Sequence, residues 1–253
     1  MKLLPSGSGY HRERSAALAN LLKQLRAGAA AATLIIVGLA PAIAADPVAP
    51  EAPGLAPYFV PVSSAPKAPD ADGFLQRWLL LEPIVKPNRS NTGFTGTYVR
   101  QALTTEYFKG QFKGAPRDGQ TVAAGAPLRW HALDSTLFDV KLFNFAQGLN
   151  KPVYGVIFWA VTVIDSPREI SNVRLAVGSN SASMWWVNGK EAAGLFGDRR
   201  MVMDDVVSQP LTLHKGKNIL RGAVINGPGL SDFCVRFIDE DGHPIRDIAL
   251  DLR

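Results

Sequence analysis

Four histidines, one cysteine and two short runs of acids are the residues best suited to chemistry, and their spacing limits what that chemistry could be. No histidine has another histidine or a cysteine at the helical or ligand spacing of a zinc site; the four are His11, His131, His214 and His243. The acid runs at 204–205 and 239–241 fall among turn-forming residues. The sequence has no G-x-S-x-G elbow, no phosphate-cradling glycine loop and no dinucleotide fingerprint. We therefore predict no catalytic residue, no metal and no cofactor, although two carboxylates brought together only in space could still form a glycosidase pair.

The single cysteine, Cys234, lies in Phe233-Cys234-Val235-Arg236-Phe237, a run typical of a strand. One cysteine cannot form an intramolecular disulfide, so the fold must depend on its hydrophobic core. We expect this thiol to be buried and structural rather than nucleophilic.

Residues around an expected hairpin could bind a ligand rather than react with it. Asn188-Gly189 is a strong signal for a two-residue type I′ turn, and it follows a short apolar run. Because side chains alternate along a strand, Trp186 is expected in the core, and Trp185 could stack on a sugar ring if its face is exposed. Nearby polar groups could hydrogen-bond hydroxyls, although a turn or surface role is the ordinary explanation for each. The predicted ligand-binding set is Trp185, Asn188, Arg199, Arg200 and Asp205, with Lys190 and Asp204 as further candidates.

The elements that position these residues are expected to be strands. Glycine and proline are frequent, 23 and 18 of 253 residues, which suits short strands joined by turns. Residues 153–164 are apolar almost throughout, as in a strand buried on both faces. Strands are expected at 78–81, 128–132, 153–164, 170–177, 184–187, 204–207, 211–213, 219–225, 233–238 and 245–250, and one helix at 97–108. We predict an all-β fold: a jelly-roll-like antiparallel β-sandwich with one short helix, at residues 73–253.

A family resemblance rests on a series of spaced residues. They are Leu175, Val177-Gly178-Ser179-Asn180-Ser181, Trp186-Val187-Asn188-Gly189-Lys190, Asp205, Leu211, Leu213, Lys215-Gly216, Asn218, Leu220, Phe233 and Val235-Arg236. This order resembles the galactose-binding-domain-like jelly rolls that accompany glycosidases, acetylxylan esterases and other carbohydrate-active enzymes. The resemblance covers about residues 73–251 and is most specific at 154–236. In such modules the loop before the hairpin carries two acids that can hold a cation; Asn180 and Ser181 stand there in this chain, so no Ca²⁺ site is expected.

The first 44 residues differ in character from the rest. Five basic residues and one acid account for four of the five net positive charges of the chain, and an apolar stretch at 27–40 and Ala42-Ile43-Ala44 follow. A basic region, an apolar region and an A-x-A site are the parts of a secretory signal. We predict a signal peptide at 1–44 and export to the periplasm or beyond. An uncleaved anchor is the alternative, and membrane association is expected only in that case.

Residues 45–72 contain seven prolines, a composition typical of an extended Pro/Ala-rich linker in which the run at 58–60 could dock locally. Since the chain after residue 44 is nearly neutral, no nucleic-acid partner is expected.

Three functions stay open on these grounds. The leading hypothesis is an exported, non-catalytic carbohydrate-binding or adhesion-type module whose partner is a polysaccharide or other glycan. The second is a carbohydrate esterase or hydrolase acting on decorated polysaccharide, similar to acetylxylan esterases. The third is a structural envelope protein that docks on a partner protein. An exposed Trp185 with polar neighbours would favour the first, and a broad apolar patch would favour the third.

Overall fold

The structure is a computed structural model that describes residues 54–88, 90, 93–197 and 199–253. The expected signal peptide and the first residues of the expected linker lie outside this part. No helix in the described ranges is long and apolar enough to span a membrane.

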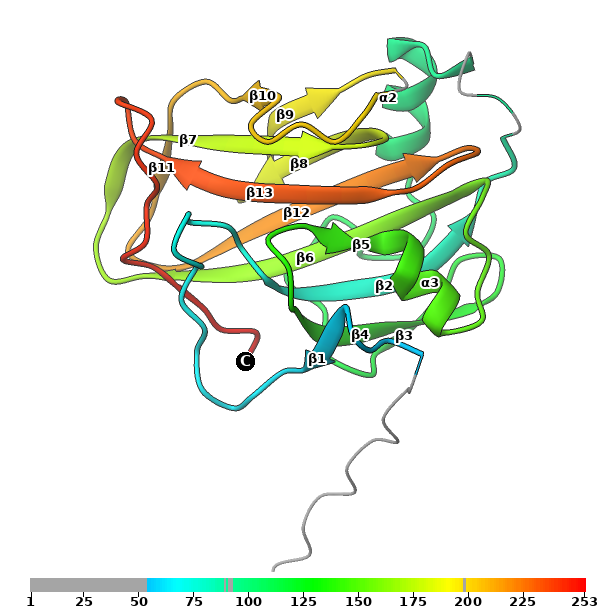
Figure 1. The fold of residues 1–253 in the computed structure, drawn as a ribbon, viewed down its shortest axis with the longest axis horizontal. Coiled ribbons are helices and arrows are strands. Elements are labelled where there is room, and N and C mark those ends of the chain that lie inside the picture. Colours follow the sequence, from blue (N-terminus) through cyan, green and yellow to red (C-terminus); the bar gives the residue numbers. More distant parts are fainter. Residues whose placement is uncertain (1–53, 89, 91–92, 198) are drawn as a thin grey trace, which may run out of the picture. The chain divides into compact units, whose positions relative to one another are not determined.

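Two antiparallel sheets pack face to face, which confirms the predicted β-sandwich (Figure 1). The nine-stranded sheet has the order β1-β4-β2-β6-β12-β8-β9, with β14 paired to β6 and β3 to β4. Its strands are β1 (Phe59–Pro61), β2 (Arg77–Val85), β3 (Thr121–Ala123), β4 (Pro127–Ser135), β6 (Val156–Ser166), β8 (Ala182–Val187), β9 (Lys190–Leu195), β12 (Gly216–Asn226) and β14 (Ala249–Leu250).

The five-stranded sheet has the order β10-β7-β13-β5, with β11 paired to β7. Its strands are β5 (Val140–Lys141), β7 (Ile170–Ser179), β10 (Val206–Val207), β11 (Leu211–Leu213) and β13 (Asp232–Ile238). Two helices complete the described part, α2 (Gly96–Thr104) and α3 (Leu142–Gly148). The sequence predicted α2 but not α3.

Strand β6 is buried along almost its whole length because both of its faces are covered, as its unbroken apolar sequence predicted. Phe158 and Ala160 point into the core between the sheets. Trp159 and Val161 point to the outer face of the nine-stranded sheet, which α2 and the segment after it cover. On that outer face the Trp159 ring stacks on Trp186, with ring centroids 5.8 Å apart, and the predicted core position of Trp186 is confirmed.

The helix α2 ends four residues earlier than its periodicity suggested. Its first turn is capped by Thr95, whose hydroxyl accepts a hydrogen bond from the Tyr98 amide at 3.2 Å. At its other end the hydroxyls of Thr104 and Thr105 donate back to carbonyls one turn earlier, and Thr105 takes an extended backbone. The chain from residue 105 to 120 therefore leaves the helix and crosses the outer face of the sheet.

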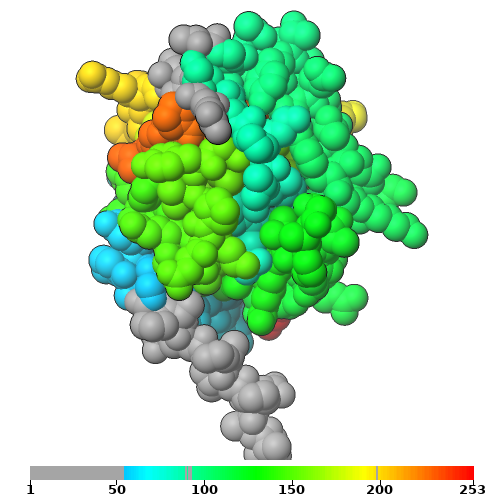
Figure 2. Space-filling model, turned by 90° about the vertical axis from the view of Figure 1, so that its right-hand side faces the viewer, coloured from blue at the N-terminus to red at the C-terminus, as the bar shows by residue number. Residues whose placement is uncertain are grey.

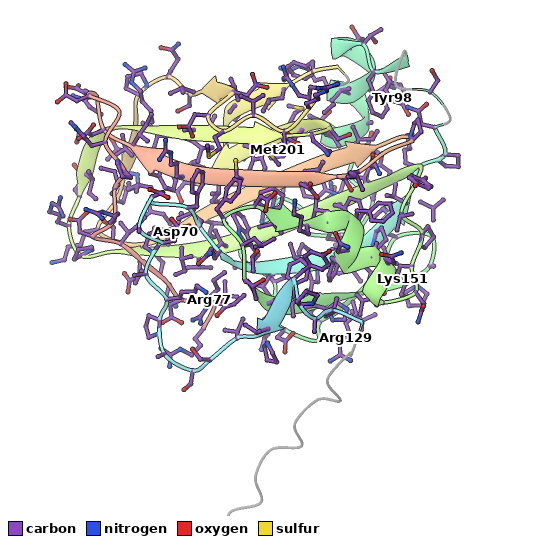
Figure 3. The ribbon with its side chains drawn as sticks, viewed as in Figure 1. Asp70, Arg77, Tyr98, Arg129, Lys151 and Met201 are labelled. Atoms are coloured by element: carbon purple, nitrogen blue, oxygen red, sulfur yellow. The ribbon has the colours of Figure 1, made fainter. Side chains whose placement is uncertain are left out.

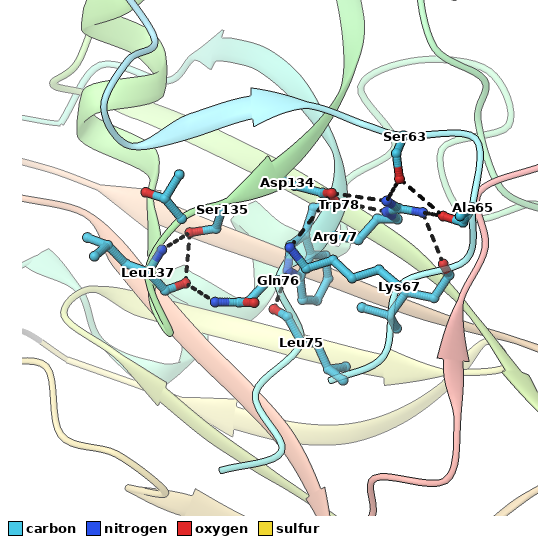
Figure 4. A network of polar contacts seen from close by, with 12 residues as sticks. Ser63, Ala65, Lys67, Leu75, Gln76, Arg77, Trp78, Asp134, Ser135 and Leu137 are labelled. Carbon is cyan, nitrogen blue, oxygen red and sulfur yellow. Dashed lines mark hydrogen bonds and ion pairs between the residues drawn. The ribbon is translucent and has the colours of Figure 1, made fainter. Parts of the chain in front are cut away.

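Residues 54–72, expected to be part of an extended linker, pack against the sandwich. Strand β1 pairs with β4, and Phe59 is buried against the Phe145 ring at 6.1 Å. The buried Arg77 guanidinium, on β2, binds both carboxylate oxygens of Asp134 at 2.8 and 3.0 Å (Figure 4). The same guanidinium donates to the Ala65 carbonyl at 2.6 Å, so it joins this segment to the nine-stranded sheet.

Candidate functional site

Asn188 forms the turn between β8 and β9, as predicted, and its side chain is used within the fold. Its backbone φ is 49°, the left-handed conformation that a type I′ turn requires. The amide oxygen accepts from the Ile219 amide and the amide nitrogen donates to Asn218 Oδ1, both at 2.9 Å. These bonds fix the hairpin on β12 and explain the residue without a ligand.

Trp185 lies in the core between the sheets, which corrects the expectation that it presents a face to a sugar. It has no exposed surface, and its ring contacts Trp78 and Phe233 with centroids 6.1 and 5.0 Å apart. Its indole nitrogen donates to Ser183 Oγ at 3.0 Å. Strand alternation placed Trp185 and Trp186 on opposite faces correctly, but both faces of this strand are covered.

The other three predicted residues lie at the far end of the same hairpin. Strand β9 runs away from Asn188 for six residues, about 20 Å at the rise of a strand. Arg199 and Asp205 follow that far end and pair with each other at 3.0 Å, and Arg200 beside them is exposed. The structure therefore does not bring the five predicted residues into one site.

A different surface gathers binding groups at one end of the sandwich, which we name the loop end. It comprises residues 86–88, 153–155, 180–181 and 227–231 together with Phe143, and Figure 2 looks onto this end, where segments coloured lime, orange and cyan to teal meet. Backbone hydrogen bonds join its parts: Lys86 N to Gly155 O at 2.8 Å, Phe143 N to Ser231 O at 3.0 Å, and Asn180 N to Asp232 O at 3.2 Å.

An exposed aromatic ring occupies the loop end. Tyr154 is 56% exposed, and its ring lies against Phe143 at 5.8 Å between centroids. Gly155 follows it with φ +62° and passes close to the backbone of Asn88, a conformation and a space that suit only glycine. This turn separates Tyr154 from the buried start of β6 and leaves it outside. Leu230, 58% exposed, adds a further apolar side chain from the β12–β13 connection.

Three polar side-chain atoms at the loop end are buried and make no hydrogen bond in the described part of the chain. They are Asn88 Nδ2, Asn180 Oδ1 and Ser231 Oγ. A buried polar atom without a partner costs about 1–3 kcal/mol, so such atoms need a ligand or an ordered water to explain them. Together they offer a donor, an acceptor and a hydroxyl that can do either, the same capacities that sugar hydroxyls require.

Sequence reasoning missed this surface for an identifiable reason. Tyr154 was assigned to the apolar run at 153–164, whereas β6 begins only at Val156. Asn180 and Ser181 were noticed as the residues that replace two acids, and they form the short turn between β7 and β8. The available signal was Tyr154-Gly155, a large aromatic followed by a glycine, just before a buried strand.

One acid–base cluster lies elsewhere and was not visible in the sequence. Glu82 Oε1 is 3.3 Å from His131 Nε2, and Glu82 Oε2 is 3.0 Å from Lys151 Nζ. Lys151 lies in the chain just after α3 (Figure 3). Burial lowers the pKa of His131 more than the nearby carboxylate raises it. Within the described ranges no serine or cysteine hydrogen-bonds to this histidine, so no activated nucleophile accompanies it.

Cys234 and the acids near the C-terminus have structural explanations. Cys234 is 1% exposed, as predicted, and burial raises the pKa of its thiol to about 12. Asp239, Asp241 and His243 approach one another closely enough to share an ion. However, Asp239 Oδ1 already accepts the amides of Asp241 and His243 at 3.0 and 2.8 Å, the pattern of a side-chain-closed turn.

Comparisons with known proteins add little beyond the fold. No family model matches the chain, and no curated protein matches it. Among solved structures it is similar to a PA14 sugar-binding domain from an RTX adhesin, with 13% identity and a TM-score of 0.35 over 68% of this chain and 95% of that one. It is also similar to the PA14 domain of the MpAFP antifreeze protein, with 9% identity and a TM-score of 0.34 over 68% and 89%.

A third similar structure is the Ruminococcus gnavus β-glucuronidase in complex with uronic isofagomine, with 12% identity and a TM-score of 0.34. The match covers 77% of this chain and 40% of that one. At these identities and TM-scores the three likenesses carry no inference about ligand or activity.

Proposed function

We propose that the chain is an exported, non-catalytic carbohydrate-binding module of adhesion type, and that it binds its glycan at the loop end. The observation that supports this is the exposed Tyr154 ring beside three buried polar atoms that lack partners. A sugar ring has an apolar face that packs on an aromatic ring and hydroxyls at its edge that both donate and accept. Stacking on Tyr154 would satisfy the apolar face of the sugar, and side-chain rotation would bring Asn180 and Ser231, which has no exposed surface in the structure, to the hydroxyls at its edge.

The loop end is suited to binding rather than to bond cleavage. Its three buried polar atoms without partners belong to amide and hydroxyl groups, which titrate far from neutral pH and are poorly suited to general acid–base catalysis. Its parts are fixed to one another by backbone hydrogen bonds to the ends of β6, β7 and β13, so only side chains have to move to admit a ligand. An aromatic face and uncharged hydrogen-bonding groups are sufficient to recognise a hydroxylated ligand.

The test is binding of the purified chain to a glycan array, followed by titration with any sugar that is captured. Tyr154→Ala should raise the Kd at least about tenfold, equivalent to about 1.4 kcal/mol, and Ser231→Ala should raise it by a similar factor. Phe138→Ala is the matched control, since this ring is 39% exposed and packs on Phe74 on the outer face of the five-stranded sheet.

Selective capture that both loop-end variants weaken and the control leaves unchanged supports the proposal. Capture that neither loop-end variant affects places the site elsewhere and overturns it. A chain that captures no glycan overturns the carbohydrate reading itself and leaves docking on a partner protein as the next hypothesis. A chromogenic acetyl ester offered to the same preparation tests for hydrolysis, and turnover would contradict the non-catalytic assignment.

A further inference from the structure

A small cavity lies on the outer face of the nine-stranded sheet, away from the loop end, beneath the segment that follows α2. Its volume is about 60 Å³. On the side of the sheet the cavity is lined by Trp130 of β4, Val161 of β6 and Arg221 of β12. The other side is lined by residues 108–111, Lys113, Ala115, Pro116 and Gln120. A water occupies roughly 15 Å³ on this measure, so the cavity has room for about four waters or one small polyatomic ion.

Arg221 enters this cavity as a buried cation. Along β12 it shares a face with Ala223 and Ile225, and in the sheet it is flanked by Val161 and Trp186. It is only 3% exposed, and in the described part of the chain no carboxylate forms an ion pair with it. Burial lowers the pKa of its guanidinium, which reflects the cost of a charge without a counterion.

A structural role accounts for only part of this arrangement. The two Nη groups donate to the Phe112 and Gly114 carbonyls and so attach the segment after α2 to the sheet. Carbonyl dipoles solvate the charge but do not neutralise it, and an unpaired buried charge is strongly unfavourable. The Nε–H is buried and has no hydrogen-bond partner among the described residues. A role in attaching the segment therefore leaves both the charge and one donor unexplained.

The other residues that line the cavity also favour an anionic ligand. The Trp130 indole N–H is also buried without a hydrogen-bond partner in the described ranges. Lys109 and Lys113, both exposed, contribute to the lining, and no Asp or Glu does. The cavity lining thus combines one buried cation, two cations near solvent and two residues with an unused N–H donor. The three cations favour an anion, and the N–H donors suit any oxygen acceptor, a carboxylate included.

We propose that this cavity is a binding site for a carboxylate group. A carboxylate fits the available volume, supplies the missing counterion to Arg221 and accepts from N–H donors. The group could belong to a free small acid or to a uronic acid at the end of a glycan. The site is separate from the loop end and does not depend on the function proposed for that surface.

The experiment is calorimetric and thermal titration of the purified chain with acetate and with glucuronate, at ionic strength held constant with sodium chloride, and with glucose as the neutral sugar. We expect saturable heats in the calorimeter and, at a concentration tenfold above Kd, a rise in Tm of about 3–6 °C that grows with the logarithm of the ligand concentration. Trp130→Phe keeps an aromatic ring but removes the donor, and should weaken binding at least about tenfold. Arg129→Met, at the exposed neighbour on the same strand, is the control and should bind as the parent does.

Arg221→Met should abolish binding, and if this variant does not fold, Trp130→Phe still provides the test. Acetate binding without glucuronate binding assigns the site to a free small acid, whereas binding of both assigns it to sugar acids as well. No saturable response to either carboxylate, or equal affinities for Trp130→Phe and Arg129→Met, overturns the proposal. Tyr154→Ala should leave the acetate response intact, so failure at this cavity and failure at the loop end are distinguishable.

Discussion

Replacing Gly222 by alanine should damage the core more than any other single added methyl group on β12. Gly222 faces Trp185 across the β8–β12 pair, and its missing side chain provides the space in which the indole lies. A Cβ built on Gly222 would stand 2.3–2.6 Å from three ring atoms of Trp185. Carbon atoms in contact are about 3.5 Å or more apart, so the ring would have to retreat by roughly 1 Å.

The cost follows from what surrounds that ring. Trp185 has no exposed surface and is enclosed by Trp78 and Phe233, so no free volume is available for the retreat. Moving it also strains the hydrogen bond from its indole nitrogen to Ser183. Overpacking of a dense core costs about 1–3 kcal/mol and occasionally more, and this site belongs at the upper end. For a domain of this size, about 3 kcal/mol corresponds to a fall in Tm of roughly 6–12 °C.

Thermal and urea unfolding, followed by tryptophan fluorescence and near-ultraviolet circular dichroism, measure the effect. Gly96→Ala is the matched control, because Gly96 lies at the start of α2 and the nearest atom to its added Cβ is 4.0 Å away; this variant should gain up to about 1 kcal/mol. Combining Gly222→Ala with Trp185→Leu should cost less than the sum of the two single changes. A Tm for Gly222→Ala within 2 °C of the parent, or strict additivity, would show that the core can accommodate the extra methyl group.

Four further predictions concern other parts of the molecule. The Cys234 thiol should not react with a disulfide reagent in the native protein at pH 8 and should react fully in urea, because burial raises its pKa to about 12; native reactivity would show that the strand opens. Arg77→Met leaves the buried Asp134 with Lys67, 3.7 Å away, as its remaining cationic partner, which should cost about 3 kcal/mol and lower the Tm by about 6 °C or more, measured against the exposed control Arg246→Met. The folded pKa of His131 lies below its ordinary 6.5, so the folded state binds this proton less readily than the unfolded chain, and stability is lost as pH falls from about 6.5 through the folded pKa. Melting curves for His131→Gln should therefore change less than those of the parent between pH 7.5 and 5.5, and equal changes would contradict the assignment. We also predict that export removes residues 1–44, so N-terminal sequencing of the mature chain should begin close to residue 45, and an intact Met1 would favour the anchor.

Short sequence patterns predicted much of the architecture. The unbroken apolar run of β6 predicted a strand covered on both faces, and Asn188-Gly189 predicted the hairpin turn through its positive φ. Alternation predicted that Trp185 and Trp186 point to opposite faces, because successive side chains on a strand must do so. Cys234 was placed correctly in a buried strand for the same reason. Each of these features depends on residues that are adjacent in the sequence, so a local pattern is enough to predict it.

The binding surfaces depend on residues that are far apart in the chain. Whether Trp185 is exposed depends on what covers its face, and Trp78 and Phe233 come from other strands. The loop end joins four connections through hydrogen bonds that no local pattern predicts, and Trp130 and Arg221 meet at one cavity although 91 positions separate them. Local sequence pattern therefore accounts for the longer strands, the sandwich and the alternation of side chains along each strand. Which side chains remain exposed or unpaired follows from the folded arrangement alone, because exposure and pairing depend on what distant parts of the chain place beside them.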